Sequence, residues 1–142
     1  MQQIADELAI RNLLARLAHV SDWGTVEEVA SCYTADATWS TPASPNVDLP
    51  ANDRNGLDDI IAGVRERRAA GIQGPGSRGR HMITTTHVSF VSADEAAVDS
   101  CFLFIDESQV PPVLRSTGRY HDTVRRDGGD WKLAARQIIY DR

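Results

Sequence analysis

The sequence has little that would suit a membrane, a nucleic acid or an oxidising compartment. No apolar run is long enough to cross a bilayer, and the N-terminus lacks the pattern of a secretory signal. Acidic residues outnumber basic ones by 20 to 15, whereas nucleic-acid-binding surfaces are basic. The only two cysteines, Cys32 and Cys101, lie in apolar segments, which favours core thiols but leaves a disulfide open. We therefore expect a cytoplasmic protein that binds neither membranes nor nucleic acids.

Sequence motifs that identify common catalytic sites are also missing. There is no glycine-rich phosphate loop, no nucleophile elbow and no Cys–His arrangement typical of nucleophilic catalysis. Internal repeats and low-complexity tracts are absent as well. What remains is 142 residues of ordinary composition, 42% hydrophobic and 25% charged, which predicts one globular domain spanning residues 1–142.

Helical patterns dominate the first part of the chain. The apolar residues Ile4, Leu8, Leu13, Leu14 and Leu17 recur at helical spacing, and the pattern fades near residues 21–24. Thr25 and Glu28 form a capping box that predicts the start of a second helix. A short strand is expected at residues 36–40.

Two segments rich in proline or glycine interrupt these patterns. Residues 41–55 contain three prolines and are expected to form a loop, after which Asn55 would cap a third helix that closes at Gly71. A second loop is expected at residues 71–79, which contain four glycines. Either loop would be a lid over a site or a surface connection.

The second half reads as strands. Residues 81–91 and 96–106 are rich in Thr, Val and Phe, and residues 117–142 form two strands around an Asp-Gly-Gly-Asp turn. Helices followed by a run of antiparallel strands indicate an α+β fold, with helices on one face of a sheet.

Alternation in the last hairpin separates two faces. A two-residue turn at Gly128-Gly129 places an apolar face inward, together with Gly118. On that face, the turn pairs Arg126 with Trp131, Val124 with Leu133, Asp122 with Ala135, and Tyr120 with Gln137. The opposite face, toward solvent or a subunit interface, would carry Arg119, His121, Arg125 and Arg136. An error of one residue in this register would reverse the assignment.

Three segments carry a resemblance to a known family. They are Ala18–Trp39 (with AHVSDWGTVEEV and YTADATW), Arg80–Thr84 (RHMIT), and Gly118–Asp122 (GRYHD) followed by GDWKL and Arg136. The combination resembles the SnoaL-like branch of the nuclear transport factor 2-like superfamily, which includes scytalone dehydratase and bile acid 7α-dehydratase. The resemblance implies a cone-shaped α+β barrel, in which a curved mixed or antiparallel sheet wraps around three N-terminal helices. It also implies homodimers or homotrimers formed through the sheet, and activity on a small-molecule substrate without metal or organic cofactor.

Asp22 and His81 match a facing aspartate and histidine in the dehydratase relatives. A histidine can take a proton from carbon beside a carbonyl and return it to a leaving hydroxyl, while a carboxylate holds its ring in one tautomer. The competing interpretation is that Asp22 caps a turn and His81 is a strand-edge residue.

Other residues are expected to complete the site. Tyr120 would donate a hydrogen bond to a substrate oxygen or serve as an aromatic core residue. Asp122 would be a second cavity carboxylate or the partner of an arginine. The remaining residues expected to bind substrate are Trp23, Tyr33, Trp39, Phe102 and Phe104.

The chain departs from these dehydratases at one position. They carry a catalytic tyrosine just before the aspartate or one turn earlier, where this chain has Ser21, Leu17 and Ala18. Tyr120 or Tyr33 would have to replace that phenol, or the dehydration chemistry would be absent.

Two further clusters have simpler explanations. His87 shares a face with His81 in an unbulged strand, but nothing has the spacing of known metal motifs, so no metal site is predicted. Arginines at 65, 67, 68, 78 and 80 are explained by a helix C-terminus and a solvated loop, with an anionic substrate as the alternative.

The sequence thus predicts a small cofactor-independent lyase or isomerase, similar to a dehydratase. Its substrate would be a mostly apolar cyclic carbonyl compound, polyketide- or steroid-like, bound in the cone cavity. The alternative is a non-catalytic ligand-binding protein or a β-type assembly subunit of a ring-hydroxylating dioxygenase. A roomy cavity that holds Asp22 and His81 within hydrogen-bond distance would favour the enzyme.

Overall fold

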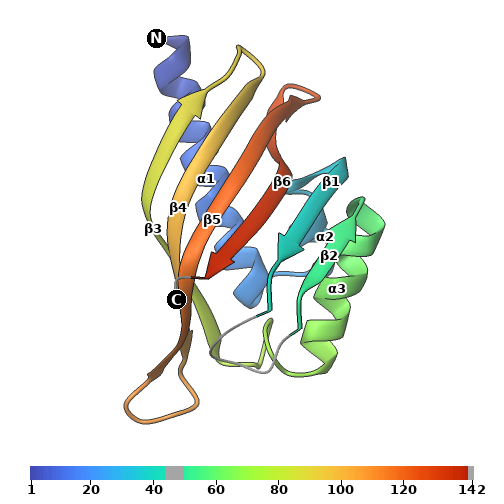
Figure 1. Ribbon diagram of the computed structural model, residues 1–142, viewed down its shortest axis with the longest axis vertical. Helices are drawn as coiled ribbons and strands as arrows, with labels where there is room; N and C mark the ends of the chain where they lie inside the picture. The colour runs from blue at the N-terminus through green and yellow to red at the C-terminus, as the bar shows by residue number, and fades with distance from the viewer. Residues whose placement is uncertain (44–49, 141–142) are drawn as a thin grey trace.

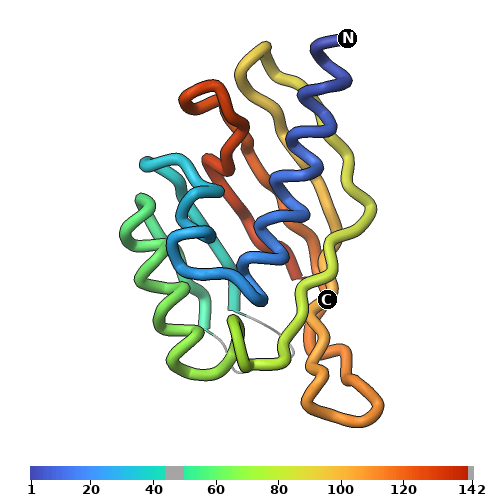
Figure 2. Tube along the Cα trace, turned by 180° about the vertical axis from the view of Figure 1, so that it is seen from behind, coloured from blue at the N-terminus to red at the C-terminus, as the bar shows by residue number. Residues whose placement is uncertain are grey.

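One curved, unclosed sheet with helices on a single face makes up the fold (Figures 1 and 2). The computed structural model describes residues 1–43 and 50–140. The strand order is β2-β1-β6-β5-β4-β3, antiparallel except where β1 pairs with β6. In chain order the elements are α1 (Gln2–Trp23), α2 (Val26–Ala30), β1 (Tyr33–Thr41), β2 (Asn52–Asn55), α3 (Leu57–Ala69), β3 (Gly79–Phe90), β4 (Glu95–Asp106), β5 (Val113–Asp127) and β6 (Asp130–Tyr140). The predicted α+β class is confirmed.

The long helix α1 lies across the inner face of the sheet (Figure 2). Leu13, Leu14 and Leu17 of the predicted stripe are buried against the sheet. Ile4 and Leu8 belong to the same helix, as their spacing predicted, but are 65% and 58% exposed. The reason is their place on the helix: Asp6 and Ile10 of the same turns are 8% and 0% exposed, so Ile4 and Leu8 lie on the side of α1 that faces away from the sheet.

Local sequence signals predict the start of α2 correctly but not that of α3. The capping box of α2 is confirmed, because Glu28 donates its backbone N–H to Thr25 Oγ1 at 3.1 Å and accepts from the Thr25 backbone at 2.7 Å. Asn55 does not cap α3. It ends β2, and Gly56 occupies the cap position with φ +86°, a conformation that glycine adopts without strain.

The first strand, β1, is longer than expected. β1 extends over Tyr33–Thr41 rather than 36–40, because parallel pairing with β6 lengthens it. β2 falls inside the predicted loop 41–55 and pairs with β1 through Trp39 and Arg54. The part of that loop at residues 44–49 lies outside the described residues. The loop predicted at 71–79 occupies the connection between α3 and β3.

The final hairpin forms as predicted near its turn and departs from the prediction beyond it. Arg126 pairs with Trp131 and Val124 with Leu133, but the register then shifts so that Thr123 pairs with Ala135. Ala134 is therefore the extra residue of a β-bulge. As a result Asp122 lies opposite Arg136 instead of Ala135, and Tyr120 opposite Ile138 instead of Gln137.

Beyond the bulge, the side chains of β6 point to the opposite face of the sheet from the one predicted, whereas those of β5 keep their predicted faces. Gly118, Tyr120 and Asp122 are buried as expected, and Arg119 and His121 are exposed. Arg136, which was expected to face outward, is only 7% exposed and lies on the inner face. The core is continuous over the helix-covered part of this face, and both cysteines are free thiols.

Candidate functional site

A cavity of about 560 Å³ opens between the end of α1, the loop at 71–79 and the inner face of the sheet. This volume is in the range of pockets that hold small organic molecules. Apolar side chains form much of the wall, including Leu17, Trp39, Val64, Phe102, Phe104 and Ile138. The charged residues that line it are Arg67, His81, Asp106, Arg115 and Arg136.

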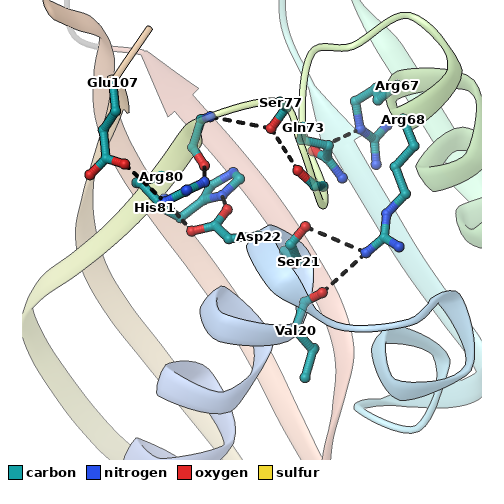
Figure 3. Close-up of polar contacts among 12 residues, drawn as sticks. Val20, Ser21, Asp22, Arg67, Arg68, Gln73, Ser77, Arg80, His81 and Glu107 are labelled. Atoms are coloured by element: carbon teal, nitrogen blue, oxygen red, sulfur yellow. Dashed lines mark hydrogen bonds and ion pairs between the residues drawn. The ribbon is translucent and has the colours of Figure 1, made fainter. Parts of the chain in front are cut away.

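Asp22 and His81, which are 59 residues apart, meet at this cavity (Figure 3). Asp22 Oδ1 lies 2.6 Å from His81 Nδ1, and Oδ2 accepts the His81 backbone N–H at 2.8 Å. The Asp22 side chain is 1% exposed and that of His81 is 19% exposed. Because a carboxylate only accepts hydrogen bonds, Nδ1 carries the hydrogen, and Nε2 keeps its lone pair in the neutral ring.

Two neighbours fix the position of this pair. Arg68 of α3 donates to the carbonyl of Gly24 at 2.9 Å, and to that of Val20 at 3.1 Å, as Figure 3 shows. These bonds hold the end of α1 that carries Asp22. On the strand side the His81 ring packs on Phe104, with ring centroids 4.8 Å apart. Both partners are thus held by elements that do not depend on a ligand.

Tyr120 contacts two other side chains in the cavity wall. Its ring stacks on Phe102, with centroids 4.6 Å apart, and the Arg136 guanidinium carbon lies 3.8 Å from its ring centroid. Burial raises the pKa of Tyr120, although the nearby Arg136 partly opposes this. The phenol therefore stays protonated at neutral pH and is a hydrogen-bond donor.

Asp122 is fully buried but does not line the cavity. Arg136 Nε and Nη2 donate to its two carboxylate oxygens at 2.8 Å and 2.7 Å. Of the two roles predicted for Asp122, the arginine partner is the one observed. Burial opposes the Arg136 charge, but Asp122 more than offsets this, and the pKa of Arg136 is raised.

Most of the predicted substrate-binding residues line the cavity, namely Tyr33, Trp39, Phe102 and Phe104. Trp23 does not, and its predicted role is wrong. It is 54% exposed, stacks on His19 with centroids 5.4 Å apart, and lies 4.6 Å from the Arg80 guanidinium carbon. The reason is its helical position: Asp22 is 1% exposed, and Trp23, the next residue of α1, points to a different side of the helix.

The position of the missing tyrosine is also part of the cavity wall. Leu17, Ala18 and Ser21 line the cavity, so no phenol is present at that place. Tyr33 and Tyr120 bring phenols to the same cavity from β1 and β5.

Three arginines line the cavity, and the sequence analysis placed none of them there: Arg67, Arg115 and Arg136. It named Arg67 only within a cluster for which an anionic substrate was the alternative explanation. For Arg67 a signal was present, because Ile60, Val64 and Arg67 recur at helical spacing on the buried stripe of α3. For Arg136 the alternation pointed the wrong way because of the bulge.

His87 lies away from this cavity. Thr85 has a φ of +51°, and the register of β3 shifts between Thr84 and His87, so a bulge interrupts the alternation of the strand between His81 and His87. Across residues 1–43 and 50–140 there is no group of three or more His, Cys, Asp or Glu side chains arranged to hold a metal ion. In the same ranges no helix is long and apolar enough to cross a membrane.

Comparison with known proteins identifies one matching family and several solved structures with a similar fold. A model of the SnoaL-like domain matches residues 2–137. No curated protein matches the sequence significantly.

Solved structures share the fold at low identity. A protein of unknown function with a cystatin-like fold from Nostoc punctiforme is 20% identical, covering 96% of this chain and 92% of that one, with a TM-score of 0.80. A candidate scytalone dehydratase from Novosphingobium aromaticivorans is 23% identical over 99% and 87%, with a TM-score of 0.76. The β subunit of a candidate aromatic-ring-hydroxylating dioxygenase from the same organism is 20% identical over 99% and 91%, with a TM-score of 0.74.

Proposed function

The chain belongs to the SnoaL-like domain family, and from this premise we propose that it is a cofactor-independent lyase or isomerase. The substrate is a mostly apolar cyclic carbonyl compound that binds in the cavity. His81 moves the proton, Asp22 orients His81, and Tyr120 polarises the carbonyl oxygen.

The observation that carries this proposal is the His81–Asp22 pair at the wall of an open cavity. A side chain that merely completes a strand edge would not need both oxygens of a buried carboxylate. A scaffold subunit would not need a cavity of about 560 Å³. The low-identity structures support the fold only and do not decide between these functions.

The reaction follows from the groups that line the cavity. Nε2 of His81 takes a proton from the carbon beside the carbonyl, and the electron pair moves into an enolate whose oxygen accepts a hydrogen bond from Tyr120. In dehydration the imidazolium then protonates a hydroxyl at the β carbon, which leaves as water while the C=C bond forms. In isomerisation the same proton is delivered to another carbon. Tyr33 and Tyr140 also line the cavity and could hold the oxygen in place of Tyr120.

Hydrogen exchange in D₂O tests the shared first step without knowledge of the natural substrate. A panel of bicyclic ketones such as 2-tetralone is incubated with the protein, and deuterium uptake beside the carbonyl is followed by NMR. The wild type should accelerate uptake, and His81→Gln should lower the rate by about 10²-fold or more. His87→Gln, which alters an exposed histidine of the same strand, is the matched control.

The alternative function predicts a different pattern. A ligand-binding protein or assembly subunit would bind members of the panel without accelerating exchange. Exchange that persists unchanged in His81→Gln would remove His81 from the mechanism.

A further inference from the structure

Arg67 is the cavity cation that lacks a carboxylate partner. Of the other charged residues that line the cavity, Arg136 pairs with Asp122 and Arg115 pairs with Asp106, each at 2.7 Å. His81 is hydrogen-bonded to Asp22. Across residues 1–43 and 50–140, no carboxylate forms an ion pair with Arg67. Among the described residues that line the cavity, Arg67 therefore carries the one positive charge without a carboxylate partner.

The guanidinium of Arg67 is held with its terminal nitrogens available. Its carbon lies 5.0 Å from the ring centroid of Trp39, and Nε donates to Gln73 Oε1 at 3.2 Å (Figure 3). Nη1 and Nη2 make no hydrogen bond to another described residue. Burial lowers the pKa of Arg67, which means that its charge is held at a cost, yet arginine stays ionised. Two parallel N–H donors are the geometry that a carboxylate accepts.

Two buried phenols give a second, independent indication of a polar ligand. Tyr33 and Tyr120 line the same cavity and are only 7% and 5% exposed. In the part of the chain that the structure describes, no residue forms a hydrogen bond with either hydroxyl, and neither oxygen is fully buried. Both are close enough to Arg67 to interact with its charge. Hydroxyls that are open to the cavity and lack a protein partner can donate to a ligand that carries oxygen atoms.

We propose that Arg67 binds a carboxylate of the ligand, which narrows the substrate class to cyclic apolar compounds that carry one carboxylate. The step from ligand to substrate rests on the function proposed above. A single unmatched charge fits a monoanion, whereas a phosphate dianion would need a second unpaired cation. Trp39 and the apolar wall around it hold the hydrocarbon part, and Arg67 fixes one end of the molecule relative to His81.

A pair of compounds that differ only in charge tests the proposal. 2-Naphthoate and its neutral analogue 2-naphthamide are titrated into the protein by calorimetry. The wild type should bind the acid about tenfold more tightly or better, because hydrogen bonds to charged groups exceed neutral ones. Arg67→Gln, which keeps the length of the side chain but not its charge, should bring the ratio close to one. Arg65→Gln, an exposed arginine of the same helix, should leave the ratio unchanged.

A second variant keeps the test valid if Arg67→Gln folds poorly. Gln73→Glu places a carboxylate on the Arg67 guanidinium without removing the arginine, and should also abolish the preference for the acid. Equal affinities of the wild type for the two compounds, or no binding of either, would overturn the proposal. A preference that persists in both Arg67→Gln and Gln73→Glu would do the same.

Failure of this proposal can be told apart from failure of the proposed function. His81→Gln should keep the preference for the acid while it loses deuterium exchange. If exchange does not depend on His81 but the preference depends on Arg67, the carboxylate site stands and the lyase or isomerase assignment falls. If exchange depends on His81 and the preference is absent, only the carboxylate site falls.

Discussion

Asp122→Asn should destabilise the protein strongly, although Asp122 does not line the cavity. The substitution keeps the shape of the side chain and removes its charge. In the wild type, Arg136 Nε and Nη2 donate to the two carboxylate oxygens of Asp122. In the variant, Arg136 remains a buried cation and has one good acceptor in place of two. The side chains of Arg136 and Asp122 are 7% and 0% exposed, so little water reaches the contact between them to replace the lost partner.

The burial of the pair sets the size of the effect. Removing one partner of a buried ion pair costs about 3–5 kcal/mol of unfolding free energy. With a urea dependence of about 2 kcal/mol per molar for a chain of this size, the unfolding midpoint should fall by about 1.5–2.5 M. The assay is urea unfolding followed by circular dichroism and by tryptophan fluorescence, which should give coincident transitions.

Two further variants separate charge burial from a general loss of packing. Asp122→Leu combined with Arg136→Met should recover much of the loss, because apolar replacement of a buried pair is often close to neutral. Asp99→Asn breaks the exposed contact between Asp99 and His121 and should shift the midpoint by less than about 0.5 M. A midpoint for Asp122→Asn as high as that of Asp99→Asn would refute the reasoning.

Two other predictions concern Gly118, which packs beside the cavity residue Phe102, and Asp106, which lines the cavity. In Gly118→Ala the new Cβ would lie 2.4 Å from the Ile139 carbonyl oxygen and 2.9 Å from the Phe102 ring. We therefore expect the free energy of unfolding, measured with urea, to fall by about 1–3 kcal/mol. An unchanged unfolding midpoint would contradict this. Hydrogen bonds from Ser108, followed by Arg115, lower the pKa of Asp106 from 3.8 to about 2. Because the folded-state pKa is the lower one, this stabilisation is present above pH 4 and is lost as the pH falls toward 2. Asp106→Asn should therefore flatten the pH dependence of unfolding in that window, and an unaltered slope there would count against the assignment.

The fold could be predicted from the sequence because its signals are local and repeated. Helical spacing in α1 and α3, the capping box at Thr25, and alternation in the late strands all act within a few residues. The start of α3 was missed for a related reason. Asn55 is a good capping residue, but pairing of β2 with β1 outweighs that preference and moves the cap to Gly56.

The candidate site could be predicted only in part, because its members come from distant parts of the chain. Nothing in the spacing of Asp22 and His81 pairs them, and the family resemblance brought them together. Arg136 was missed because one extra residue, Ala134, reverses the alternation of β6, and no composition signal marks that bulge. The helical register of Arg67 could have predicted its place in the cavity. The usual preference of cations for helix C-termini gave a simpler explanation for this residue.

The most direct test of the central claim is the rate of deuterium uptake by a cyclic ketone in the presence of wild type, His81→Gln and His87→Gln. The proposed mechanism predicts acceleration by the wild type and by His87→Gln, and a rate at least about 10²-fold lower for His81→Gln. Equal rates for the wild type and His81→Gln, with the His81→Gln variant folded, would contradict it.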